Sequence, residues 1–136
     1  MSYISETPIN QALEAVISMM NAVNPFATVT RGALPTGAGL TCELAPSRPT
    51  SEHMDRNTVI PLDVTLNGKH EDLQLLSDTM HRLHRALTRE TNYPREESWQ
   101  IIDITNNTLP QVIGREQNNE WLMASSLNVK FYWRGD

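Results

Sequence analysis

The chain has 136 residues, of which 39% are hydrophobic and 20% charged, and its formal net charge is −5. This composition predicts one soluble globular domain over residues 1–136 and argues against disordered, collagen-like and membrane-spanning classes. The net negative charge argues against non-specific binding of nucleic acid. The single cysteine, Cys42, excludes an internal disulfide framework and a zinc site built on several thiolates.

The first predicted element is a helix over residues 8–23. Thr7 followed by Pro8 is typical of a helix start, and Asn24-Pro25 is typical of a helix end. Between them the apolar residues recur three and four positions apart, at Ile9, Leu13, Val16, Ile17 and Met20. This spacing predicts one buried helix face.

Two short β-like runs follow, at residues 26–31 and 39–44. Glycines and a proline lie between them, which predicts a turn or a hairpin. Residues 45–57 lose all periodicity and are rich in proline, serine and threonine. We expect this stretch to form a long protruding arm between two strands.

Apolar and polar residues alternate over residues 60–66, which predicts a strand with one buried face and one solvent-exposed face. Because proline cannot donate to a β-ladder, we expect Pro61 at an edge, at a bulge or near the start of the strand. The dipeptide Asn67-Gly68 predicts a turn after it.

A long amphipathic helix is predicted over residues 70–91. Glu71 and Asp72 lie in its expected first turn, where negative charge is favourable, and Asn92 follows its expected end. Its apolar stripe consists of Leu73, Leu76, Met80, Leu83 and Leu87.

Two more strands are expected, at residues 99–105 and 121–133, joined by a polar connector at residues 106–120. The resulting order is α-β-β-β-α-β-β. Since hairpins dominate, we predict an α+β fold with an antiparallel or mixed sheet of about five strands. The N-terminal helix and the long helix should pack on one face of that sheet.

The sequence offers little evidence for a metal site or a cofactor. The histidines are His53, His70, His81 and His84. His81 and His84 are spaced to share a helix face, but arginines surround them, and nearby cations oppose metal binding. We therefore expect no metal, no cofactor and no catalytic residue, and we expect Cys42 to be a buried, inert thiol.

One enzymatic alternative remains open. Asp63 and Asp103 each lie within a predicted strand, and adjacent strands could bring them together with a helix histidine such as His84 for acid–base chemistry. The simpler interpretation places both carboxylates on the solvent-exposed face of the sheet. The two interpretations differ in whether these side chains converge.

Aromatic side chains on the last strand favour an interaction surface. Phe131 and Trp133 should point to one face and Tyr132 to the other, and a small domain has one core to fill. We therefore predict interface residues on this strand and in the arm: Pro46, Arg48, Pro49, Trp121, Phe131, Tyr132 and Trp133.

The order of these elements resembles the tail terminator or tail-completion proteins of long-tailed bacteriophages and prophages, also described as minor capsid proteins. The resemblance lies in a strand such as residues 59–66, a long leucine-rich helix and a strand such as residues 99–104. A connector such as residues 108–114 and a final strand such as residues 121–132 complete it.

This resemblance, over about residues 5–134, implies a structural protein and not an enzyme. It implies a ring, typically a hexamer, that caps the tail tube, stops its polymerisation and joins it to the head-side connector. DNA would pass through the lumen without specific binding. The resemblance places the protein in the tail or neck of the virion, and in the host cytoplasm during assembly. Another head–tail neck component or adaptor is the related alternative.

Overall fold

The computed structural model describes residues 8–45, 58–97 and 99–133. It contains two helices and a mixed five-stranded sheet, so the predicted α+β class and element order are confirmed. The elements are α1 (Pro8–Asn21), β1 (Val29–Thr30), β2 (Gly39–Leu44), β3 (Thr58–His70), α2 (Leu73–Thr88), β4 (Trp99–Arg115) and β5 (Trp121–Trp133).

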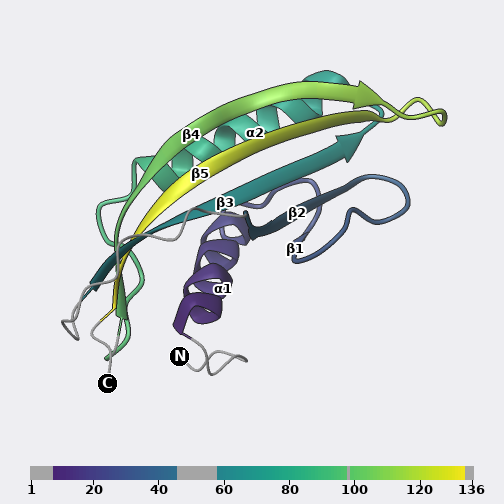
Figure 1. Cartoon of the computed structure of the whole chain (residues 1–136). Helices are drawn as coiled ribbons and strands as arrows, with labels where there is room; N and C mark the ends of the chain where they lie inside the picture. Colours follow the sequence, from purple (N-terminus) through teal and green to yellow (C-terminus); the bar gives the residue numbers. More distant parts are fainter. Residues whose placement is uncertain (1–7, 46–57, 98, 134–136) are drawn as a thin grey trace.

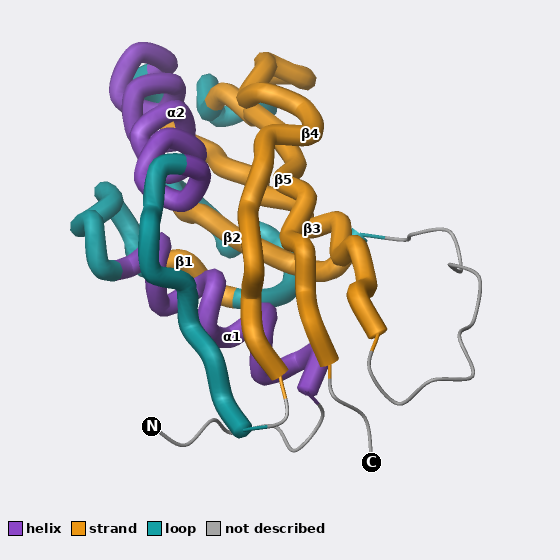
Figure 2. Tube along the Cα trace, turned by 90° about the vertical axis from the view of Figure 1, so that its left-hand side faces the viewer, coloured by secondary structure: helices purple, strands orange, loops and turns teal. Residues whose placement is uncertain are grey.

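The sheet has the strand order β1-β2-β3-β5-β4. Only β1 and β2 are parallel, and the other neighbours are antiparallel. The long strands β3, β5 and β4 arch over α2 (Figure 1), and both helices lie on one side of the sheet (Figure 2). The prediction that the helices pack on one face is confirmed.

Of the turn or hairpin predicted before β2, the hairpin is wrong, because β1 runs parallel to β2 with Val29 opposite Leu40. The end of α1 accounts for this arrangement. The Asn21 side chain accepts a hydrogen bond from the Val29 backbone N–H at 2.8 Å and donates one to its carbonyl at 3.2 Å. Gly32 and Gly37 both have positive φ angles, which let the connecting segment return the chain for a parallel pairing.

The predicted turn at Asn67-Gly68 is also wrong, because β3 continues through it to His70. Gly68 pairs with Leu40 on β2 and with Met123 on β5. Pro61 lies near the start of β3, before the part that β2 pairs with, as predicted.

Helix α2 is shorter at both ends than the predicted range of residues 70–91. Its start is set by Asp72, whose side chain accepts a hydrogen bond from the Leu75 backbone N–H at 3.1 Å. Asp72 is therefore the N-cap and not a residue of the first turn. The predicted stripe is confirmed, since Leu76, Met80, Leu83 and Leu87 are fully buried.

Strand β4 extends to Arg115, so the predicted connector at residues 106–120 is largely strand. Four register shifts against β5 interrupt the pairing, between Ile101 and Gly114. These bulges absorb residues that break the alternation of a regular strand, which explains why the sequence pattern missed this part. The actual turn covers residues 116–120 and includes Asn119 with a positive φ of 68°. Strand β5 has the predicted bounds.

The core lies between the sheet and the two helices. Trp99 on β4 stacks on Phe131 of β5, with ring centroids 5.8 Å apart and an interplanar angle of 17°. The Trp99 indole N–H donates to the Gln11 side-chain oxygen at 2.7 Å, which ties α1 to β4. Because side chains alternate along β5, Leu127, Val129 and Phe131 enter this core and their even-numbered neighbours face the opposite side.

Candidate functional site

The predicted interface residues of the arm lie outside the described residues. These are Pro46, Arg48 and Pro49, within residues 46–57. The part of the interface prediction that the structure can place is therefore the part on β5.

The four aromatic residues of β5 differ in their surroundings. Phe131 is fully buried and belongs to the core. Tyr132 is half-buried and alternates to the other face. Trp121 is half-buried, and the Arg115 guanidinium lies 4.7 Å from its ring centroid. For Trp133 only the backbone is described, and it pairs with Thr58 and Trp99. Phe131 thus has a core role, Trp121 packs against the core with part of its surface accessible, and Tyr132 is the partly accessible aromatic on the other face.

The structure adds an apolar segment on β4 that the sequence analysis missed. Leu109, Val112 and Ile113 are 56%, 46% and 61% exposed, respectively. They lie on an edge strand, whose only neighbour among the described strands is β5. The sequence did contain a signal for this segment, because these three apolar residues lie within a connector that was expected to be polar. Exposed apolar clusters of this kind are typical of interaction surfaces.

The edge of β4 is poorly suited to accept another strand at this point. The register shifts on both sides of Thr108 distort the strand, and Pro110 has no backbone N–H to donate. Both features occur in natural sheets that avoid edge-to-edge pairing. A partner at this segment would therefore be recognised mainly by side chains.

The residues of the enzymatic alternative do not come together. Asp63 and Asp103 are in register with Asn128 and Lys130 of β5, on the face opposite the buried Leu127 and Val129. The Asp63 carboxylate accepts a hydrogen bond from the Asn128 amide at 3.0 Å. His84 is buried on the helix side, so the sheet separates it from both carboxylates. Such a separation leaves no joint acid–base site.

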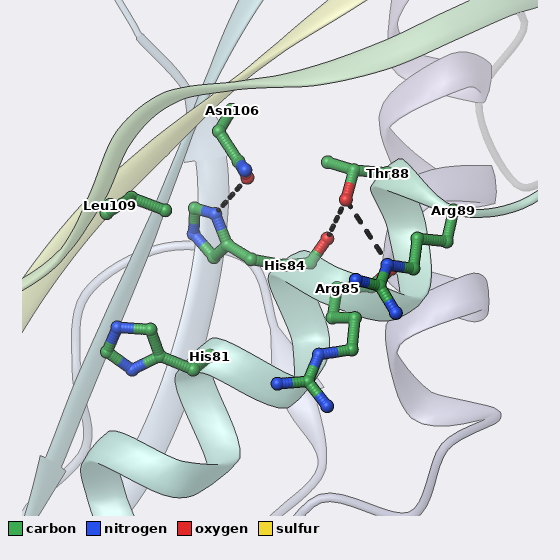
Figure 3. A pocket seen from close by; sticks show the side chains of 7 residues that line it. All are labelled: His81, His84, Arg85, Thr88, Arg89, Asn106 and Leu109. Carbon is green, nitrogen blue, oxygen red and sulfur yellow. Dashed lines mark hydrogen bonds between the residues drawn. The ribbon is translucent and has the colours of Figure 1, made fainter.

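His84 instead links α2 to three strands. Its Nδ1 is 2.8 Å from the Asn106 side-chain oxygen on β4 (Figure 3), and its Nε2 is 2.8 Å from the Ser125 hydroxyl on β5. The Ser125 hydroxyl also donates to the Leu66 carbonyl of β3 at 3.0 Å. Burial is the main cause that lowers the pKa of His84, and nearby His81 lowers it further. This arrangement is a structural polar network within the core.

We expect the lowered pKa of His84 to make folding sensitive to mild acid. The unfolded chain binds a proton at this side chain near pH 6.5, and the folded chain does so only at lower pH. The contribution to stability is therefore complete above about pH 6.5 and is lost as the pH falls toward the folded pKa. Urea denaturation between pH 7.5 and 5.5 should show a steeper loss for the wild type than for His84→Gln. Equal losses in the two proteins would contradict this assignment.

The other candidate metal and thiol residues have local structural partners. His81 Nδ1 is 2.8 Å from the Ser77 carbonyl, and His70 Nδ1 accepts from the Asp72 backbone N–H at 2.8 Å. His53 lies outside the described residues. Within the described ranges, no three His, Cys, Asp or Glu residues are grouped so that they could hold a metal ion. Cys42 is fully buried, as predicted, and burial raises the pKa of its thiol to about 12.

Comparisons with known proteins identify a related fold and no family. The sequence matches no family model and no curated protein. A solved structure described as the virion of a native gene transfer agent particle contains a chain with a similar fold. The TM-score is 0.67 with 9% sequence identity, over 94% of this chain and 99% of that chain. The likeness covers nearly the whole of both chains, so the two share an architecture.

Neither α1 nor α2 combines the length and the apolar character needed to cross a bilayer.

Proposed function

We propose that this protein is a structural virion-assembly protein that acts as a tail terminator. The observation that carries the proposal is the fold shared with a chain of a gene transfer agent virion over nearly the full length of both. The resemblance in element order to phage tail terminators supports the same assignment. The separation of Asp63, Asp103 and His84 favours a role without bond-making chemistry.

In this proposal, copies of the protein form a ring, with a hexamer as the expected form. A head-to-tail contact whose rotation closes produces a ring without a two-fold axis. Tyr132 and Trp121 are the aromatic side chains that β5 leaves partly accessible for such contacts. The net charge of −5 also suits a lumen through which DNA passes without being held.

The ring would cap the growing tail tube, stop its polymerisation and present its other face to the head-side connector. Its location would then be the tail or neck of the virion, after assembly in the host cytoplasm. The chemistry needed is surface complementarity alone, and it requires no cofactor.

The test is the association state with and without tail tubes of the same particle. We expect sedimentation velocity and native mass spectrometry to detect a ring of about six chains, or electron microscopy to detect the protein at one end of each tube. Some ring proteins assemble only on their partner, so both conditions are needed. A protein that stays monomeric at high concentration and leaves tube length unchanged would refute the proposal.

A further inference from the structure

A cavity of about 220 Å³ opens between the last turns of α2 and the middle of β4 (Figure 3). His81 and Arg85 of α2 and its C-cap residue Arg89 line one side, and Asn106 and Leu109 of β4 line the other. The helix residues are spaced four apart, so they lie on one side of α2. The cavity is therefore a polar, cationic pocket with one apolar side chain at its border.

The charge of this pocket is opposite to that of the chain. The sequence has 16 acidic and 11 basic residues, yet no acidic residue lines the pocket among the described residues. The ion pairs in the described part of the chain are Arg31–Glu43 and Lys69–Glu116, so neither Arg85 nor Arg89 has a carboxylate partner there. Two like charges four residues apart on a helix repel each other, and a bound anion would relieve that repulsion.

The surroundings favour a carboxylate of a protein over a phosphate. Guanidinium groups bind carboxylates and phosphates alike through paired, charge-assisted hydrogen bonds, so the apolar surroundings decide between the two. Leu109 borders the pocket, and the exposed Val112 and Ile113 follow it on the same strand. An acidic side chain with apolar neighbours matches the cationic pocket and its Leu109 border, and it could extend along the strand toward Val112 and Ile113. A nucleic acid backbone matches only the charged part and is disfavoured by the acidic chain.

We propose that the pocket between α2 and β4 binds an acidic side chain of a partner protein, while Leu109, Val112 and Ile113 contact apolar side chains next to that acid. Pro110 and the register shifts beside it direct recognition to side chains and not to added strand pairing. This inference does not depend on ring formation or on a role in tail termination.

The first experiment uses acetate as the carboxylate probe. The Nε–Hε signals of Arg85 and Arg89 are followed by NMR during titration with sodium acetate, sodium phosphate or sodium chloride at matched ionic strength. We expect saturable shifts at millimolar acetate, and no saturation with chloride. These shifts should disappear in the Arg85→Gln/Arg89→Gln variant and persist in Arg95→Gln, which removes an exposed charge outside the pocket. Equal responses to chloride, or tighter binding of phosphate, would overturn the proposal.

The second experiment tests the apolar part with a blocked Leu-Glu-Leu tripeptide. We expect it to bind about tenfold more tightly than acetate, and the Leu-Gln-Leu version to lose that binding. Ile113→Ser should reduce the advantage of the peptide over acetate without changing acetate binding. An unchanged advantage in Ile113→Ser would refute the apolar contact. Shifts at Arg85 and Arg89 that grow with protein concentration alone would assign the pocket to a second copy and overturn the separate partner.

Discussion

Replacing Phe131 by alanine is expected to lower the free energy of unfolding by about 3–5 kcal/mol. Phe131 is fully buried, and its ring stacks on Trp99 across the β4–β5 pair. The substitution removes this stack and leaves a cavity between the sheet and the helices, which the surrounding side chains can fill only in part. Urea denaturation followed by tryptophan fluorescence and circular dichroism measures the loss.

The neighbouring residue supplies the control. Tyr132 is half-buried on the other face of the sheet, so Tyr132→Ala should cost about 1 kcal/mol or less. If the tail terminator proposal holds, Tyr132→Ala should weaken association while the monomer stays folded. Similar losses of stability in the two variants would show that the alternation along β5 does not separate core from surface.

Replacing Gly68 by valine is expected to lower the free energy of unfolding by about 1–3 kcal/mol. A Cβ atom at this position would lie 2.7 Å from Leu76 Cδ1 and 2.9 Å from Met80 Sδ on α2. It would also lie 3.0 Å from Leu40 Cδ2 on β2. The branched side chain would therefore force α2 away from the sheet or its side chains out of their preferred rotamers. Thermal and urea unfolding measure the effect.

Gly114 is the matched control on β4. A Cβ atom there would meet only Leu122 Cδ1 at 3.9 Å, which is an ordinary contact. Gly114→Val should leave stability unchanged or raise it slightly, because valine suits a strand better than glycine. A loss in Gly114→Val as large as that in Gly68→Val would indicate that β-strand glycines are generally required here, independently of helix packing.

Much of the fold followed from local periodicity. The α2 stripe of Leu76, Met80, Leu83 and Leu87 was predicted, and so were the bounds of β5. Both elements bury one continuous face, and this keeps their pattern regular. The pattern failed in β4, where bulges break the alternation and the strand continues through residues expected to form a connector.

The candidate site was much harder to predict from the sequence than the fold. The alternation along β5 predicted that Phe131 and Tyr132 face opposite sides, and the structure shows that Phe131 lies in the core and not at an accessible surface. The pocket brings Arg85 of α2 and its C-cap residue Arg89 close to Leu109 of β4, which is distant in the sequence. The spacing of these residues in the sequence cannot predict that their side chains line a common cavity.

The amino-acid sequence by itself determined the type and order of the elements, because helix and strand periods are properties of neighbouring residues. Only the tertiary structure decided the parallel pairing of β1 with β2, the continuation of β3 through Gly68 and the accessible edge of β4. These features depend on which segments meet. Asn21 occupies the backbone groups of Val29, and α2 packs directly over Gly68. Contacts with other elements decided the direction of β1 in the first case, and contacts between distant residues overrode the local preference for a turn in the second.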